Sequence, residues 1–334
     1  MPSDAVLRLP LELRYARGFA FRAWWLPPPL GLLGGLLAVR GAPLAERLGA
    51  VRFVRALRRS GFAAAAHTTV RELLAAHGQD GALGRFLWQP LCVAALNTPA
   101  AEASAAVFLA VLRDTLGGEP GAADLLLPRV DLSRLFPEPA LEHVRRRGGE
   151  VQLRSPVPSL EALRGFDAVI VAVGPHQLRG LLPALGERFS YQPIYTCYLQ
   201  YPERTRLPFP MLGMSQGLVH WVFDRGLLAG ERGRFACVIS ARGAHQAMTL
   251  EELGDACHRE LAAVLPGLPA PRWRRTIAEK RATIACTPGL ARPAAEVDGV
   301  FLAGDYTDPE YPPTLEAAVR SGVRAAERVA GLLV

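Results

Sequence analysis

The residues best suited to chemistry lie near the carboxyl end of the chain, where Gly304 and Asp305 follow the apolar run 300–303. Such a run predicts a short strand that is buried on both faces. Open α/β sheets bind ligands beyond the carboxyl ends of their strands, so Asp305 is a candidate ligand contact. A helix is predicted to begin near Thr314 and Leu315, and its free N–H groups suit an anion or an electron-rich ring oxygen. The alternative is an ordinary strand-turn-helix that closes an α/β domain.

Other patterns that could indicate catalytic or binding residues are weaker. The segment 213–217 matches the G-x-S-x-G nucleophile elbow, but that motif needs a strand before it and a helix after it. A proline-rich turn precedes this segment and a predicted strand follows it, which favours a glycine-rich hairpin turn. The seven histidines include no metal-ligand spacing. Glu12, Asp131 and Asp224 are candidate acids, but no pattern pairs them.

Composition indicates a globular chain of 334 residues, of which 50% are hydrophobic. The net charge of +7 is almost all arginine, with Lys280 the single lysine. A basic face that meets anionic lipid is one interpretation and a compositional bias is the other. Nucleic acid is not expected as a partner, because no basic run is interleaved with aromatic residues. Five cysteines far apart in the sequence form neither a disulfide framework nor a zinc pattern, and they favour a reducing cytosol.

The apolar segment Leu26–Val39 is the one candidate for contact with lipid. It is broken by three prolines and three glycines, and no stretch of the chain reaches the ~18 apolar residues that would span a bilayer. No signal peptide is evident at the start of the sequence. A buried loop and helix, or a surface that dips into lipid, both fit. We expect a cytoplasmic location, with peripheral membrane contact as an open alternative.

Hydrophobic spacing predicts mainly helices over residues 1 to about 130. Thr69 with Glu72 forms a capping box, and Thr98–Pro99 is predicted to start a helix that ends at 117–118. Further along, a helix from Pro139 to Arg147 and two strands, 150–153 and 168–173, indicate an α/β layer.

Period-two alternation then predicts strands 194–201, 218–223, 235–240 and 273–284. A helix with Thr249 and Glu252 as its capping box interrupts these strands. An antiparallel sheet with helices packed on it would make a substrate domain, with an apolar cavity between the sheet and a cofactor.

The tail FLAGDYTDPEYPPTLEAAVRSGVRAAERV, residues 301–329, resembles the carboxyl-terminal flavin signature of the phytoene desaturase and amine oxidase superfamily. That resemblance implies that Gly304 and Asp305 bind the ribityl-pyrophosphate part of FAD. It also implies that the helix start at Thr314 and Leu315 points backbone N–H groups at the isoalloxazine, and that Val157 lies near the adenine. The segment after Val157 is shorter here than in relatives, and Ala317 stands where relatives often carry glycine.

A narrower resemblance rests on several patches in the expected order. They are PPPLGLLGGLL, FLWQPLCVAALNTP, LLLPRVDLSRLFPEPALEHV, PIYTCYLQY, HWVFDRG, CVISA and EKRATIACTPG, followed by the flavin tail. Together they resemble the squalene-associated FAD-dependent desaturases, also called hydroxysqualene dehydroxylases, of hopanoid synthesis.

The fold that this resemblance implies is mixed α/β and α+β. It combines an incomplete FAD-binding Rossmann-like domain with a substrate domain of antiparallel sheet and helices. Residues 1–135 would be the helical part of the substrate domain and 186–285 its sheet. Residues 136–185 and 286–334 would be the middle and carboxyl-terminal parts of the FAD-binding domain. The amino-terminal GxGxxG loop of such a domain is not found, since the nearest match, Gly31 to Gly35, has the wrong spacing.

The implied activity is reductive removal of a hydroxyl from hydroxysqualene, with FAD as the cofactor and an apolar polyprenoid as the substrate. Trp88, Trp221 and Phe223 are candidate cavity walls by their aromatic character, with core packing as the alternative. Asp224–Arg225 and Arg281 are candidates to orient the hydroxyl or the flavin, with structural ion pairs favoured.

The catalytic residues are not identified from the sequence. Contact with other enzymes of the squalene pathway is an open alternative. A truncated, non-catalytic relative that binds apolar lipid, a carotenoid or phytoene-type desaturase, and an amine oxidase are the alternative functions.

Overall fold

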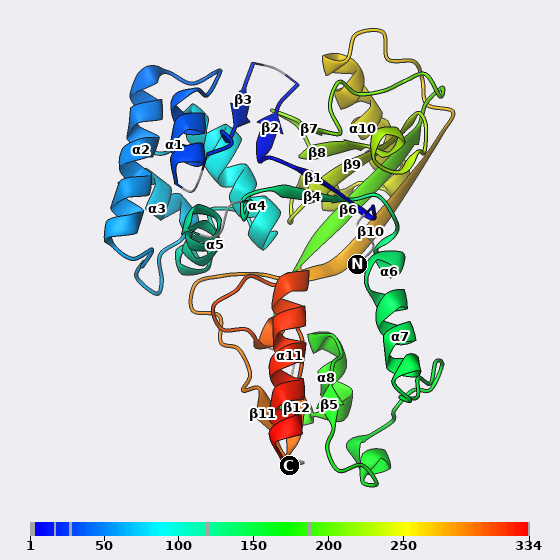
Figure 1. Ribbon diagram of the computed structural model, residues 1–334. Helices are drawn as coiled ribbons and strands as arrows, with labels where there is room; N and C mark the ends of the chain where they lie inside the picture. Colours follow the sequence, from blue (N-terminus) through cyan, green and yellow to red (C-terminus); the bar gives the residue numbers. More distant parts are fainter. Residues whose placement is uncertain (1–3, 17, 27–28, 118–120, 186–188, 333–334) are drawn as a thin grey trace.

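Figure 1 shows the computed structural model, which describes residues 4–16, 18–26, 29–117, 121–185 and 189–332. The upper part of the view holds a five-stranded sheet with helices α1 to α5 to its left. The lower part holds a three-stranded sheet beside the long helix α11 (Leu315–Leu332). This mixture of helix and sheet is the fold class that the sequence predicts. Within the described ranges, no helix combines the length and apolar character that crossing a bilayer requires.

The five-stranded sheet is antiparallel throughout, in the order β10-β6-β9-β8-β7. Its strands are β6 (Tyr191–Gln200), β7 (Met211–Gly213), β8 (Trp221–Asp224), β9 (Arg234–Ser240) and β10 (Trp273–Ile284). The structure confirms the predicted strands as β6, β8, β9 and β10, and the predicted bounds of β10 agree with it, whereas β7 was not predicted. Short β7 and β8 form a hairpin over the G-x-S-x-G segment, so no helix follows Ser215 and the nucleophile-elbow alternative is excluded.

The two faces of this sheet pack against different layers. Cys197 lies opposite Cys237, and both side chains are buried with the stripe of helix α10 (Leu250–Val264). Trp221 and Phe223 belong to the other face and pack against the amino-terminal helical core. This division follows from the two-residue period of a strand, which sends alternate side chains to opposite faces.

The amino-terminal part contains the predicted helices and four strands that were not predicted. The helices are α1 (Leu30–Leu37), α2 (Leu44–Arg59), α3 (Val70–Ala76), the π-helix η1 (Gly84–Trp88), α4 (Gln89–Leu96) and α5 (Ala105–Gly117). The strands are β1 (Val6–Leu9), β2 (Glu12–Arg14), β3 (Ala20–Arg22) and β4 (Leu125–Pro128), which form the pairs β1–β4 and β2–β3. Three or four residues are too few for a visible alternation, which explains why the sequence does not predict them.

Two local predictions were wrong. Helix α5 begins at Ala105 and not at Thr98, because the Thr98 hydroxyl is already used: it donates to Leu96 C=O at 2.9 Å and accepts from the Cys286 amide at 3.0 Å. The segment 150–153 forms no strand, and the chain there has no regular structure. Its apolar residues do not pair with a neighbouring strand, and pairing is what stabilises a strand.

The three-stranded sheet has the order β11-β12-β5 and comprises β11 (Glu296–Val297), β12 (Val300–Leu302) and β5 (Ile170–Val171). Strand β12 runs parallel to β5 and is buried on both faces, as the apolar run predicts. Val300 and Leu302 pack in one cluster with residues of α8 (Pro175–Leu181), whereas Phe301 and Ala303 pack against α11. The far edge of β5 pairs with no strand of the described residues.

The remaining elements are short or peripheral. They are α6 (Leu132–Leu135), α7 (Pro137–Arg146), α9 (Arg225–Ala229) and the 3-10 turns η2 (Leu160–Leu163), η3 (Pro183–Leu185), η4 (Ala244–Ala247) and η5 (Asp305–Thr307). The predicted helix before Gly148 is confirmed as α7. Both predicted capping boxes, at Thr69 and Thr249, are confirmed with both of their hydrogen bonds.

Candidate functional site

The loop between β12 and α11 begins at Gly304, which packs tightly within its own loop. Its amide donates to Ser321 Oγ of α11 at 2.7 Å. A Cβ atom at Gly304 would lie 2.3 Å from the ring of Tyr306, a distance that no packed pair of carbon atoms adopts. Glycine is therefore required here by the neighbouring aromatic ring.

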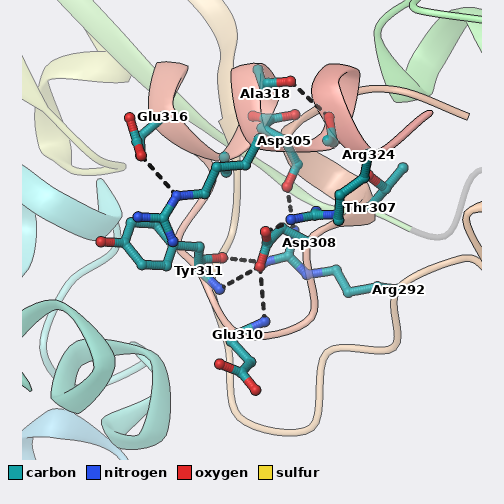
Figure 2. Close-up of polar contacts among 12 residues, drawn as sticks. Arg292, Asp305, Thr307, Asp308, Glu310, Tyr311, Glu316, Ala318 and Arg324 are labelled. Carbon is teal, nitrogen blue, oxygen red and sulfur yellow. Dashed lines mark hydrogen bonds and ion pairs between the residues drawn. The ribbon is translucent and has the colours of Figure 1, made fainter. Parts of the chain in front are cut away.

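Asp308 organises the next part of the loop, as Figure 2 shows. Its carboxylate accepts the amides of Glu310 at 3.1 Å and Tyr311 at 2.9 Å, and the Arg324 guanidinium at 2.9 Å. Burial alone would raise the pKa of Asp308, but these hydrogen bonds outweigh it and hold the pKa below its ordinary value. This carboxylate is committed to the fold, because its donors tie residues 308–311 to α11.

Asp305 differs from Asp308 in its partners. Burial raises the pKa of the Asp305 carboxyl, and the positive charge of Arg292 opposes that shift. The Arg292 guanidinium donates to the backbone carbonyl of Asp305 at 3.0 Å and to that of Tyr311 at 3.3 Å, and not to the Asp305 carboxylate. No side chain of the described residues hydrogen-bonds to this carboxylate, although the backbone amides of Asp305 and Tyr306 also lower its pKa. A carboxylate has about four acceptor sites, so it can still accept hydrogen bonds from ligand hydroxyls.

The first turn of α11 offers backbone donors beside this carboxylate. Thr314 Oγ1 accepts the amide of Ala317 at 3.3 Å and so caps the helix. Among the hydrogen bonds of the described residues, the amides of Leu315 and Glu316 have no acceptor, and Leu315 is 74% exposed. Unpaired amides at a helix start carry partial positive charge and bind anions or carbonyl oxygens.

A second set of contacts holds this loop against the helical part. Tyr311 donates its hydroxyl to Asp114 of α5 at 2.6 Å, and the Arg320 guanidinium lies 4.3 Å above the Tyr311 ring. Burial and the bond to Asp114 raise the pKa of Tyr311 to about 12. Asp114 is 197 residues away in sequence, so this contact joins the loop before α11 to α5.

The structure places the other predicted site residues apart from this loop. Val157 is 44% exposed in a segment without regular structure, so its contact with an adenine stays a prediction. Trp88 is 1% exposed and donates its indole N–H to Gln79 at 2.9 Å, which places it in the helical core. Trp221 lines a cavity of about 30 Å³ together with Tyr15, and Phe223 lies two residues along the same face of β8.

The predicted orienting residues serve the fold instead. Asp224 is buried and caps α9, accepting the amides of Leu207 at 2.7 Å and Leu227 at 3.1 Å. Arg225 forms an ion pair with Glu231 at 2.6 Å. The predicted structural ion pair is confirmed for Arg225, whereas Asp224 caps a helix and has no ion pair among the described residues. The Arg281 guanidinium lies 5.8 Å from the Tyr191 ring centroid.

Three residues that shape this loop were missed by the sequence analysis: Asp308 within it, and Arg292 and Ser321, which contact it. A second acid three positions after Asp305 was a visible signal for Asp308. Arg292 and Ser321 contact the loop only through the fold, and no local pattern marks them. Among the described residues, no group of three or more histidine, cysteine or acidic side chains could hold a metal ion.

Comparison with known families matches residues 137–330, more than half of the chain, to the family described as flavin containing amine oxidoreductase. The chain belongs to this family. Its members are FAD-dependent oxidoreductases, so the predicted superfamily and cofactor are confirmed.

Individual relatives indicate a more specific group within this family. The hydroxysqualene dehydroxylase of Rhodopseudomonas palustris is 31% identical over 276 residues, which cover 75% of this chain and 63% of that protein. The protein of the same name from Sinorhizobium fredii is 32% identical over 272 residues, covering 74% of this chain and 63% of the relative. The chain thus matches less than two thirds of the length of these relatives.

Solved structures share the fold at low sequence identity. Cyclohexylamine oxidase from Brevibacterium oxydans superposes with a TM-score of 0.63 at 16% identity, covering 99% of this chain and 84% of that one. Reduced UDP-galactopyranose mutase superposes with a TM-score of 0.63 at 12% identity, covering 98% and 78%.

The loop after β12 fits the cofactor that the family implies. FAD carries sugar and ribityl hydroxyl groups, which donate hydrogen bonds, and a ring with carbonyl oxygens, which accept them. Asp305 presents acceptor oxygens without a side-chain partner, and the first turn of α11 presents amides without an acceptor. The two sets of groups complement each other.

Proposed function

We propose that this chain acts with FAD to remove the hydroxyl group of hydroxysqualene, giving squalene. Two relatives at 31% and 32% identity bear the name of that activity. The Asp305 carboxylate, which lacks a side-chain partner at the carboxyl end of a buried strand, is the observation that carries the proposal. It is where an open α/β sheet of this family would meet the sugar-phosphate arm of a flavin.

The groups that would hold FAD have separate tasks. Asp305 would accept hydrogen bonds from hydroxyls of the ribityl-pyrophosphate part. The amides of Leu315 and Glu316 would donate to oxygens of the flavin ring, and Thr314 would hold the first turn in place through its cap. Arg292, by holding the carbonyls of Asp305 and Tyr311, would fix the loop in the shape that presents the carboxylate.

The reaction is a two-electron reduction. When bound in reduced form, FAD would supply the hydride, with squalene, water and oxidised FAD as the products. The protein must bind a thirty-carbon chain and exclude water from a carbon that loses its hydroxyl. Trp221 and Phe223 are the predicted aromatic walls for that chain, and the cavity that Trp221 lines with Tyr15 would have to open, because its volume is only about 30 Å³.

The test is conversion of hydroxysqualene to squalene by the purified protein with chemically reduced FAD in the absence of oxygen, measured by chromatography of the extracted lipids. Asp305→Asn should lower the rate by about tenfold or more, because a charge-assisted hydrogen bond contributes about 1.5–3 kcal/mol. Asp255→Asn is the matched control, since Asp255 lies partly exposed on α10 and pairs with Arg274.

If Asp305→Asn is as active as the wild type, the proposed role of Asp305 is contradicted. Desaturation of a polyene in place of dehydroxylation would assign the chain to the desaturase alternative. A preparation that binds a polyprenoid but no flavin would assign it to the lipid-binding alternative.

A further inference from the structure

Large apolar side chains lie exposed where β3 leads into α1. Trp25 is 99% exposed, and Trp24, Leu26 and Leu30 are exposed beside it. We call these four residues the tryptophan patch. A fully exposed tryptophan is unusual in a globular protein, and a contiguous apolar surface of this kind marks an interaction site.

Backbone contacts build the tryptophan patch onto α1. The Trp24 amide donates to the Gly31 carbonyl at 2.9 Å, and the Leu26 amide donates to the Trp24 carbonyl at 2.8 Å. A Cβ atom at Gly34 would lie 2.4 Å from the Trp24 ring, so that ring rests directly on the helix where glycine leaves room. Gly34 therefore leaves room for the Trp24 ring, and Gly31 and Gly35 leave room for the backbone of residues 22–26.

Arginines surround the patch. Arg14, Arg22 and Arg40 line one cavity with Trp24 and Trp25, whereas Arg8 lines a second cavity that the same two tryptophans border. Arg14 and Arg22 both form ion pairs with the Glu12 carboxylate, with nitrogen–oxygen distances of 2.5 and 3.8 Å. Arg8 pairs with Asp124 at 2.7 Å, and exposed Arg40 has no ion pair among the described residues. The rim of the patch is therefore net positive.

The second cavity borders the patch, because Trp24, Trp25 and Leu26 line it. It has a volume of about 630 Å³, and Leu9, Leu11, Leu32 and Leu116 contribute to its walls. An apolar molecule that leaves a bilayer at the patch would therefore meet apolar side chains. This continuity distinguishes the patch from an isolated exposed tryptophan.

We infer that the tryptophan patch inserts into the interface of an anionic lipid bilayer, with Arg40 and Arg22 against the headgroups. Tryptophan is favoured at membrane interfaces, and each arginine near an anionic surface adds to the attraction. A second copy of the chain is a poorer occupant, because a twofold contact through this patch would bring two positive rims together. The lipid contact does not depend on flavin chemistry, and only delivery of a polyprenoid through the cavity rests on the proposed function.

The test is co-flotation of the protein with vesicles of phosphatidylethanolamine and phosphatidylglycerol, compared with vesicles of phosphatidylcholine alone. The wild type should bind the anionic vesicles, and the double variant Trp25→Ser, Leu30→Ser should bind them at least about tenfold more weakly. Phe166→Ser is the matched control, because Phe166 is also a large apolar side chain and is 68% exposed, between Leu30 at 57% and Trp25 at 99%, but lies far from the patch in sequence, beside η2. Circular dichroism checks that each variant is folded.

The charge is tested separately. Arg40→Gln should weaken binding to the anionic vesicles about fivefold at low salt, and this difference should shrink at high salt. Arg145→Gln on α7 removes the same charge from another surface and should leave binding unchanged.

Absence of vesicle binding would overturn the inference, as would an equal loss in Phe166→Ser. Dimerisation in light scattering that disappears in the double variant would assign the patch to a second copy of this chain. Flavin content measured on the same proteins should not change, so failure of the lipid contact and failure of the proposed function are distinguishable.

Discussion

Helices α10 and α11 have similar sequences in outline but different surroundings. Each starts at a threonine cap and carries an apolar stripe. In α10 the stripe of Leu253, Cys257 and Leu261 is fully buried against the five-stranded sheet. In α11 the residues that pack inward are small, chiefly Ala317, Ser321 and Ala325, whereas Leu315, Val319 and Val323 are exposed.

The two helix starts differ in the same way. Thr249 and Glu252 complete a capping box, so the first turn of α10 is satisfied by its own side chains. Position 317 of α11 is alanine, and the amides of Leu315 and Glu316 stay without acceptors. We conclude that α10 stabilises a buried core through its apolar stripe, whereas the first turn of α11 has free amides that can bind a ligand.

The largest expected effect is the difference in stability between substitutions on α10 and on α11. Leu261→Ala should lower the free energy of unfolding by about 2–5 kcal/mol, because it leaves a cavity in a fully buried cluster. Val323→Ala should change it by less than about 0.5 kcal/mol, because the side chain is exposed. Urea unfolding monitored by circular dichroism measures both values. Equal destabilisation by the two variants would break the distinction between the helices.

The next effect concerns the loop that leads into α11. Asp308→Asn should lower the free energy of unfolding by about 1.5–3 kcal/mol at neutral pH, because a carboxylate with three donors loses its charge.

Its pH dependence follows from the direction of the shift. The pKa of Asp308 is lowered in the folded protein, so its contribution is present above about pH 4 and is lost as the pH falls through the lower folded-state value. Asp308→Asn should therefore flatten the acid side of the stability curve relative to the wild type. If the stability of Asp308→Asn falls in acid as steeply as that of the wild type, the role given to the Asp308 carboxylate is contradicted.

The smallest effect concerns the caps. Thr249→Ala and Thr314→Ala should each lower the free energy of unfolding by about 0.5–2 kcal/mol. Thr249→Ala should cost more, because it also breaks the reciprocal box with Glu252. Thermal unfolding compares the two, and flavin content should fall only in Thr314→Ala. A fall in Thr249→Ala as well would mean that flavin retention reports general stability.

Local patterns predicted those elements whose stability depends on near neighbours in sequence. The stripe and box of α10, the alternation of β10 and the apolar run of β12 all predicted the observed elements. Helix α5 was mispredicted at its start because the Thr98 hydroxyl contacts Cys286, which lies 188 residues away. Contacts of that kind leave no local signal.

The same limit applies to the site. Asp305 and the start of α11 were visible as a strand end followed by a helix cap. The contacts that hold them, from Arg292, Ser321 and the pair Tyr311–Asp114, join segments that only the folded chain brings together. Short β1 to β4 were missed for a related reason, since each is stabilised by pairing with a distant or tightly turned partner.

Titration of FAD into the flavin-free protein, followed by quenching of flavin fluorescence, tests most directly whether the loop after β12 holds the cofactor. We predict saturable binding by the wild type and by Asp255→Asn, and binding at least about tenfold weaker by Asp305→Asn, in line with loss of a charge-assisted hydrogen bond. Equal affinity of Asp305→Asn and the wild type would contradict the role that we assign to this carboxylate.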